Sequence, residues 1–245
     1  MLQKLRNRLI VSCQAQPDEP LHSAFIMSRM ALAAQMGGAG GIRAESISDI
    51  LKIMARSKLP VIGLIKKTYP DSPVYITPTL TEVDALLNTY CPIIALDMTD
   101  RPRPAKSGGL KRMIRTIHNA GRLVLADIST CEEGIAAAAL GADAVSTTLS
   151  GYTPYSRHLE GPDVELVREL TTQVSIPVFA EGRISTPEQI KLVMDAGAWA
   201  PIVGCAITRP QAPRHRARGI SLPSSSTNRW AGSSFPASGT PAKTA

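Results

Sequence analysis

Eight short apolar runs, separated by longer segments with helical periodicity, limit what this sequence can fold into more than any other feature. Strands that are apolar almost throughout and that alternate with helices are typical of a parallel sheet covered by helices on its faces. Eight strands are the number that a closed (β/α)₈ barrel requires. We therefore predict an α/β fold, a single-domain TIM barrel. The runs are RLIVSC (8–13), GAGGIRA (38–44), LPVIGLIKK (59–67), CPIIALDMT (91–99), GRLVLADI (121–128), ADAVSTTL (142–149), IPVFAEG (176–182) and WAPIVGCAI (199–207).

The segments between the runs carry the signals that begin and end helices. Thr186 precedes a proline at the first helical position, and Thr130 precedes two glutamates in a first turn, where the helix dipole favours acids. Gly121, Gly141 and Gly197 stand where C-terminal caps are expected. The predicted helices span about 22–36, 46–57, 80–89, 108–120, 130–140, 162–173 and 185–196.

An open, doubly wound sheet is the competing architecture. Such a sheet usually carries a GxGxxG turn after its first strand, and here the first run is followed by Gln-Ala-Gln-Pro (14–17), which cannot make that turn. The glycine-rich stretch at 37–41 leads into a run instead of opening a helix. We interpret it as a tight turn, with a phosphate loop as the alternative.

The chain length suits one barrel. Its 245 residues compare with about 250 for a typical barrel. Residues 211–245 contain seven Ser, four Pro and no apolar periodicity, a composition typical of disordered segments. Yet a barrel needs an eighth helix here, so the last strand is left uncovered, a partner covers it, or this end is not a native barrel terminus. We predict a barrel over 1–210, with an atypical or missing final helix, and a disordered or non-native tail over 211–245.

The net charge of +7 does not indicate a nucleic-acid-binding body. Residues 211–245 carry five positive charges and no acid, which leaves +2 for residues 1–210. Aromatic residues make up only 4% and are not interleaved with basic ones, as a base-stacking surface requires. We expect no nucleic-acid partner for the body, although the basic tail could bind an acidic one.

Further features bear on compartment and metal binding. No apolar stretch reaches the roughly 18 residues of a membrane helix, and we identify no signal peptide. The four cysteines form no CxxC pair and the four histidines show no ligand spacing, so we expect no metal and no disulfide framework. A reducing cytosol is the compartment that we expect.

The residues that follow the runs predict the active site, because barrel chemistry lies at the carboxyl ends of the strands. Every run is followed by polar or charged residues. In chain order these are Gln14, Arg43 with Glu45, Lys66 with Lys67, Asp97 with Asp100 and Arg101, Asp127, Thr147 and Thr148 before Tyr152, Glu181 before Arg183, and Cys205 before Thr208 and Arg209.

Lys66 is the candidate general base. It directly follows the apolar run VIGLI, and burial beside cations such as Arg43 and Lys67 would lower its pKa from about 10.4 towards 7–8. The alternative is a solvated loop lysine. Lys66 could instead form a Schiff base with its substrate, which would make the protein an aldolase. A further alternative is an inactive barrel that only binds a sugar phosphate.

Two carboxylates have two interpretations each. Glu181 follows IPVFA and could move a proton or bind sugar hydroxyls; its alternative is a structural ion pair with Arg43 or Lys66. Asp127 could contact substrate directly, or it could orient Lys66 or Arg43.

The turns after the last two strands predict a phosphate site. Loops after strands seven and eight commonly bind phosphate in this fold, and glycine lets the backbone N–H groups approach it closely. Simple turn formation is the alternative for each glycine. The candidates are Gly182, Arg183, Gly204, Cys205 and Arg209.

These residues occur within longer matching stretches. They are SCQAQPDEPL, GGIRAES, GLIKK, ALDMTDRPRP, LADIST, STTLSGYT, FAEGRISTPEQ and GCAITRP. Over roughly 1–210 the chain resembles bacterial N-acetylmannosamine-6-phosphate 2-epimerases. The resemblance implies interconversion of N-acetylmannosamine 6-phosphate and N-acetylglucosamine 6-phosphate without a cofactor, in sialic-acid catabolism, by a cytoplasmic homodimer. It implies a base at Lys66 and an acidic partner at Glu181, and substrate contacts at Gln14, Arg43, Asp127 and Arg209. We also predict a substrate contact at Tyr152, which follows the sixth run.

The chain departs from the family pattern at its end. Cys205 stands where the family usually has a small hydroxyl residue, and a thiol is the weaker hydrogen-bond donor to phosphate. Pro201 lies inside the eighth run and removes a backbone donor. The match stops near Gln211, where the family continues into a final helix.

Overall fold

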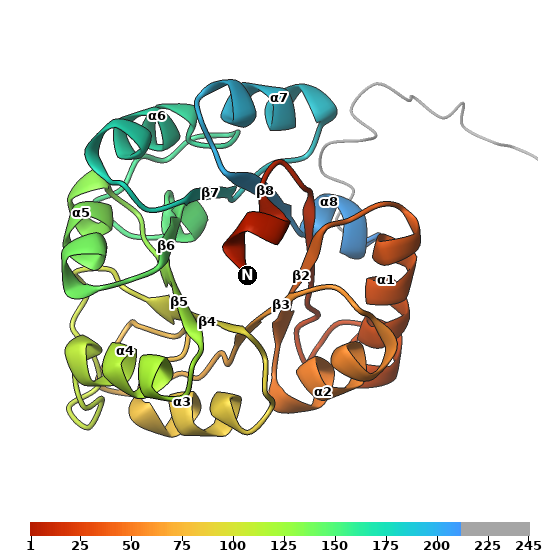
Figure 1. Ribbon diagram of the computed structural model, residues 1–245, viewed down its shortest axis with the longest axis horizontal. Helices are drawn as coiled ribbons and strands as arrows, with labels where there is room; N and C mark the ends of the chain where they lie inside the picture. Colours follow the sequence, from red (N-terminus) through yellow and green to blue (C-terminus); the bar gives the residue numbers. More distant parts are fainter. Residues whose placement is uncertain (212–245) are drawn as a thin grey trace, which may run out of the picture. The chain divides into compact units, whose positions relative to one another are not determined.

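A closed ring of eight parallel strands forms the centre of the molecule (Figure 1). The computed structural model describes residues 1–211, which belong to one compact unit, Met1–Ala212. Each strand pairs with the next in the sequence, and Ile10 of the first strand pairs with Ile202 of the last to close the ring. The predicted TIM barrel is confirmed. The strands are β1 (Ile10–Cys13), β2 (Gly41–Glu45), β3 (Val61–Leu64), β4 (Ile93–Asp97), β5 (Leu123–Asp127), β6 (Ala144–Ser146), β7 (Val178–Glu181) and β8 (Ala200–Val203).

Helices surround the ring, as Figure 1 shows, and their positions agree with the segments predicted from periodicity. Thr130 caps its helix in a reciprocal capping box with Glu133, and the Thr186 side chain accepts a hydrogen bond from the backbone N–H of Gln189. Gly141 ends a helix with φ of 100°, a left-handed conformation that glycine adopts readily. The helices are α1 (Ala24–Met36), α2 (Ile47–Arg56), α3 (Leu80–Leu87), α4 (Leu110–Asn119), α5 (Cys131–Leu140), α6 (Val164–Gln173), α7 (Pro187–Asp195) and α8 (Cys205–Thr208).

Two predicted runs extend past the strands that form. β6 ends at Ser146, and residues 147–149 turn into the short 3₁₀ helix η2 (Thr147–Leu149). β8 ends at Val203, and Cys205–Thr208 is the four-residue helix α8, the last helix among residues 1–211. Pro201 is accommodated within β8, in register with Ala180. The prediction for the tail lies outside the described residues, apart from Gln211.

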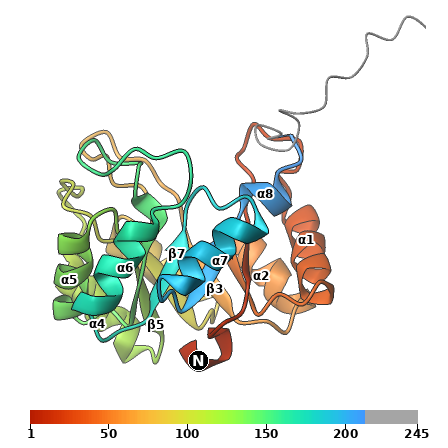
Figure 2. The same cartoon turned by 90° about the horizontal axis from the view of Figure 1, so that it is seen from above.

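The core has two layers. An outer layer packs between the ring and the helices, and a smaller inner one fills the ring. The N-terminal 3₁₀ helix η1 (Leu2–Leu5) lies at the end of the ring opposite the long loops (Figure 2), where Leu5 is fully buried in the inner layer. Trp199 donates a hydrogen bond from its indole Nε1 to the Leu2 carbonyl at 3.1 Å. One end of the ring is thus closed, and the carboxyl ends of the strands form the other.

Within residues 1–211, no helix combines the length and apolar character that crossing a membrane would require.

Candidate active site

Alternation along the strands turns the predicted site residues into the ring. In β2, Ile42 and Ala44 belong to the outer apolar layer, so Arg43 and Glu45 face inward. The same period of two carries past the strand ends, where Ile65 packs against the outer layer and Lys66 follows it. Other inward positions at this mouth are occupied by Gln14, Asp97, Asp127 and Glu181.

Arg43 is the centre of a buried charge cluster. Its guanidinium is 1% exposed and donates two hydrogen bonds to Asp127, from Nη1 to Oδ1 at 2.9 Å and from Nη2 to Oδ2 at 2.7 Å. Its Nη1 also lies 3.2 Å from Oε2 of Glu181. The three residues come from β2, β5 and β7, so only a closed ring brings them together. The sequence left open an ion pair of Glu181 with Arg43 and a contact of Asp127 with Arg43, and the structure contains both contacts.

The electrostatics of the cluster differ between its members. Burial alone would lower the pKa of Arg43, but the charges of Asp127 and Glu181 outweigh it and raise that pKa, so the guanidinium stays charged. Burial raises the pKa of Glu181, the charge of Arg43 opposes this, and the charge of Asp127 adds to it. Of the two carboxyl groups, Asp127 therefore interacts more strongly than Glu181 with the Arg43 guanidinium.

Thr148 links the two carboxylates. Its Oγ1 lies 2.5 Å from Oδ1 of Asp127 and 2.9 Å from Oε2 of Glu181. From the sequence, Thr148 is only one of the polar residues that follow the sixth run. Its inward position, two residues past Ser146, was the signal that could have selected it.

Lys66 lies at the same mouth and pairs with an acid that the sequence did not assign to it. Its Nζ is 3.2 Å from Oε2 of Glu45, and the two side chains are 27% and 20% exposed. The loop after β3 folds back to form an antiparallel bridge between Lys66 and Ile76, and the Lys67 amide donates to the Tyr75 carbonyl at 2.9 Å. The neighbour that contacts Lys66 is thus the anionic Glu45, whereas from the sequence we expected the cations Arg43 and Lys67 beside it.

A second buried carboxylate follows β4. Asp97 accepts a hydrogen bond from Nη2 of Arg101 at 2.6 Å, and the Arg101 guanidinium lies 5.6 Å from the centre of the Tyr75 ring. Burial raises the pKa of Asp97, and the charge of Arg101 opposes that rise. Burial also raises the pKa of Tyr75 to about 12, so its phenol is neutral at physiological pH. Tyr75, on a loop between predicted elements, was missed because no run precedes it.

On the opposite side of the mouth, Gln14 and Arg209 lie near the junction of β1 and β8. The amide of Gln14 donates to the Ser12 hydroxyl at 2.9 Å. Arg209 forms an ion pair with Glu19 and contacts the Cys205 sulfur. Its Nε is buried without a hydrogen-bond partner among the described residues. The predicted substrate contacts of both residues stay predictions.

The predicted phosphate residues occupy two turns. Gly182 has φ of 102°, which favours glycine, and Gly204 lies close enough to Ser12 that a Cβ added to Gly204 would be 3.4 Å from that side chain. Cys205 begins α8 with an exposed side chain.

Arg183 has structural partners that the sequence did not reveal. It donates from Nε to the Gly161 carbonyl at 2.8 Å and from Nη1 to the Ser150 carbonyl, and its guanidinium lies 5.8 Å from the ring centre of Tyr152. These bonds fasten the loop after β6, which carries the half-exposed Tyr152. Phosphate binding by Arg183 stays a prediction.

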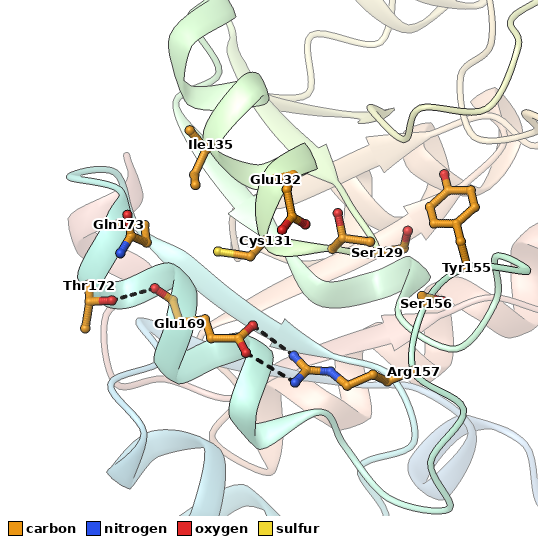
Figure 3. Close-up of a pocket in the computed structure, with 11 residues that line it drawn as sticks. Ser129, Cys131, Glu132, Ile135, Tyr155, Ser156, Arg157, Glu169, Thr172 and Gln173 are labelled. Carbon is orange, nitrogen blue, oxygen red and sulfur yellow. Dashed lines mark hydrogen bonds and ion pairs between the residues drawn. The ribbon is translucent and has the colours of Figure 1, made fainter.

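A surface pocket of about 540 Å³ lies elsewhere, between α5 and α6 (Figure 3). Figure 3 shows Arg157 paired with Glu169 along it, through contacts of 2.9 and 3.2 Å. Its wall also includes Cys131 and Ile135. None of the residues that the sequence predicts for the site lines it.

In residues 1–211, no cluster of three or more His, Cys, Asp or Glu residues has the geometry to hold a metal ion.

Comparisons with known proteins give a family. Residues 27–216 match the family described as "Putative N-acetylmannosamine-6-phosphate epimerase" (NanE). A Clostridium perfringens (strain SM101 / Type A) protein, described in the same terms as a 2-epimerase, is 58% identical over 211 residues, which cover 86% of this chain and 95% of that protein. A Clostridioides difficile (strain 630) protein with that description is 56% identical, over 86% of this chain and 94% of its own.

A solved structure agrees in sequence and in three dimensions. The N-acetylmannosamine-6-phosphate 2-epimerase from Clostridium perfringens superposes with a TM-score of 0.84 at 57% identity, covering 86% of this chain and 91% of its own. This chain belongs to the N-acetylmannosamine-6-phosphate epimerase family.

Proposed function

We propose that this protein interconverts N-acetylmannosamine 6-phosphate and N-acetylglucosamine 6-phosphate by removing and returning the proton on carbon 2 of the sugar. The observation that supports it most is the pairing of an amine and a carboxyl group at one mouth: Lys66 follows β3 and Glu181 ends β7. In a closed ring of eight strands these two strands are four apart, so the two groups reach in from opposite walls. A sugar bound between them offers one face of carbon 2 to each.

The chemistry begins with the open-chain aldehyde, in which the carbonyl makes the hydrogen on carbon 2 acidic. The neutral amine of Lys66 takes that proton, and the bonding electrons move onto the carbonyl oxygen to form an enolate. The new ammonium group stabilises the enolate. The Glu181 carboxyl group then donates its proton to carbon 2 from the other wall, which regenerates the aldehyde with inverted configuration. Exchange with solvent restores both groups.

Arg43 acts in this scheme through the carboxylates that it holds. A guanidinium that is 1% exposed and bonded twice to Asp127 has little surface left for substrate. This role differs from the direct substrate contact that the family resemblance implies for Arg43. Arg43 fixes Asp127 and, through its charge, the position of Glu181, which is the precision that proton transfer needs.

Remote groups anchor the substrate. We assign the phosphate to the turns after β7 and β8, with Gly182, Gly204 and Cys205 offering backbone N–H groups and Arg209 a charge. Gln14 and Tyr152 are proposed contacts for the rest of the sugar, and Asp127, which is fully buried, is proposed to orient Arg43. Binding energy from the phosphate then holds carbon 2 between Lys66 and Glu181.

We also propose that the protein is a homodimer and that it is located in the cytoplasm. Light scattering on the purified protein tests the homodimer.

The test is to incubate the protein with N-acetylmannosamine 6-phosphate and follow the sugar signals by proton NMR. The proposal expects the signals of N-acetylglucosamine 6-phosphate to grow, and expects Lys66→Met to abolish their growth. Borohydride added during turnover distinguishes the aldolase alternative, because it would trap a Schiff base as a stable adduct on Lys66. An adduct, or no epimer with folded protein, would contradict the proposal.

A further inference from the structure

The hydroxyl group of Thr148 has more hydrogen-bond acceptors around it than it has protons. Its Oγ1 lies 2.5 Å from Oδ1 of Asp127, 2.9 Å from Oε2 of Glu181 and 2.8 Å from the Ser146 hydroxyl. A hydroxyl group donates one hydrogen bond and accepts two. If both carboxyl groups were ionised, one of them would face an oxygen lone pair without any proton between the two atoms.

The partners of Arg43 decide which carboxylate keeps its charge. Both hydrogen bonds described for Arg43 within residues 1–211 go to Asp127, so Asp127 is the ionised member. It also makes the shorter contact with Thr148, as expected for a carboxylate that accepts a hydrogen bond from a hydroxyl group. Thr148 therefore donates to Asp127, and its hydroxyl group can then meet Glu181 only as a hydrogen-bond acceptor.

Only a protonated Glu181 completes this arrangement. A carboxylic acid at Glu181 can donate to a lone pair of the Thr148 hydroxyl group while that group donates to Asp127, so both carboxyl groups are hydrogen-bonded to it. The charge count agrees, because one buried guanidinium then balances one buried carboxylate. The charged groups that act on Glu181 are Arg43, Asp127 and Lys66, and burial together with Asp127 raises its pKa.

We propose that Thr148 is a positioning residue that holds Glu181 in its protonated form, in a directed chain from Glu181 through Thr148 to Asp127. The inference rests on the proposed function in one respect: the proton on Glu181 is the one delivered to carbon 2. It adds that the resting enzyme already holds the acid on one wall. Lys66, on the other wall, then takes the proton from one face of carbon 2, and Glu181 already holds the proton that goes to the other face.

The test uses Thr148→Val, which keeps the shape and removes the hydroxyl group, and Thr148→Ser, which keeps the hydroxyl group. Protein labelled with ¹³C at the glutamate carboxyl carbons is titrated by NMR without substrate, and Glu181→Gln identifies the Glu181 signal. We expect Glu181 to be protonated at neutral pH, and expect Thr148→Val to shift its titration by about one pH unit to lower pH, because the acid form loses its acceptor. Thr148→Ser should keep the original titration.

The sign of that shift separates the alternatives. If Thr148 donates to an ionised Glu181, its removal will shift the titration to higher pH, which overturns the proposal. An ionised Glu181 at neutral pH in the unmodified protein, or no shift in Thr148→Val, also overturns it. If Thr148→Val fails to fold, the titrations of the unmodified protein and Thr148→Ser decide. Because no substrate is present, these results are independent of whether the protein is an epimerase.

Discussion

Arg43 of β2 and Asp127 of β5 form a two-pronged ion pair, at 2.7 and 2.9 Å, that is buried almost completely inside the barrel mouth. The two strands are not neighbours in the ring, so the pair spans its interior. This pair fixes the electrostatics of the mouth: it leaves Glu181 as the second carboxyl group beside a single cation, and it ties the position of that group to the closure of the barrel.

Removing the cation should destabilise the fold. In Arg43→Met, Asp127 stays buried without its partner, and breaking a buried pair in this way costs about 3–5 kcal/mol. The free energy of unfolding from urea denaturation measures the loss. Arg168→Met is the matched control, because Arg168 pairs with Glu165 at the surface and should cost within about 1 kcal/mol. Equal losses of unfolding free energy in the two variants would show that the buried pair contributes no more to stability than the surface pair.

Lys66 should be required for turnover, and its neighbour should not. Lys66→Met removes the proposed base and should lower kcat by about 10²-fold or more, with the melting temperature little changed. Lys67→Met, at the exposed next position in the chain, should stay near normal. A Lys66→Met variant with near-normal kcat would remove this amine from the mechanism.

Glu45 should matter because it holds Lys66 in place. Its carboxylate lies 3.2 Å from the Lys66 Nζ, so Glu45→Gln should lower kcat by about tenfold through a less well oriented amine, with a smaller effect on KM. Steady-state kinetics measure both constants. An equal rise in KM with unchanged kcat would instead show that Glu45 contributes to substrate binding.

Glu181 should make the protein less stable as pH rises. Burial raises its pKa in the folded state above the usual value of 4.5. Between the two pKa values the folded state binds more protons than the unfolded state, so the free energy of unfolding falls as pH increases through that window. Glu181→Gln cannot ionise and should lose this part of the decline.

Urea denaturation of Glu181→Gln and the unmodified protein, measured from pH 4 upward at about one-unit intervals, follows the difference that this linkage predicts. Glu165→Gln, an exposed substitution, controls for general effects of removing a carboxyl group. The reverse trend, with the unmodified protein gaining stability relative to Glu181→Gln as pH rises, would show that Glu181 is stabilised as an anion.

The sequence predicts the barrel well because each strand and helix is defined locally. The apolar runs give the strands, Thr130 and Thr186 begin helices, and the period of two turns residues such as Arg43 and Glu181 inward. Their direction follows from strand parity alone, without any knowledge of contacts.

Pairing across the ring could not be predicted in the same way. Lys66 contacts Glu45, and Arg183 is bonded to loop carbonyls, because ring closure and loop conformation decide which inward groups meet. The inward position of Thr148 could be predicted, but the two carboxyl groups beside its hydroxyl group are found only in the structure.

If Lys66 and Glu181 exchange the proton on carbon 2 from opposite walls, that carbon takes up hydrogen from the solvent. N-acetylmannosamine 6-phosphate is incubated with the protein in heavy water and followed by proton NMR. We expect N-acetylglucosamine 6-phosphate to form with deuterium at carbon 2, and Lys66→Met to yield neither product nor label. Product that keeps its original hydrogen at carbon 2 would rule out this proton exchange.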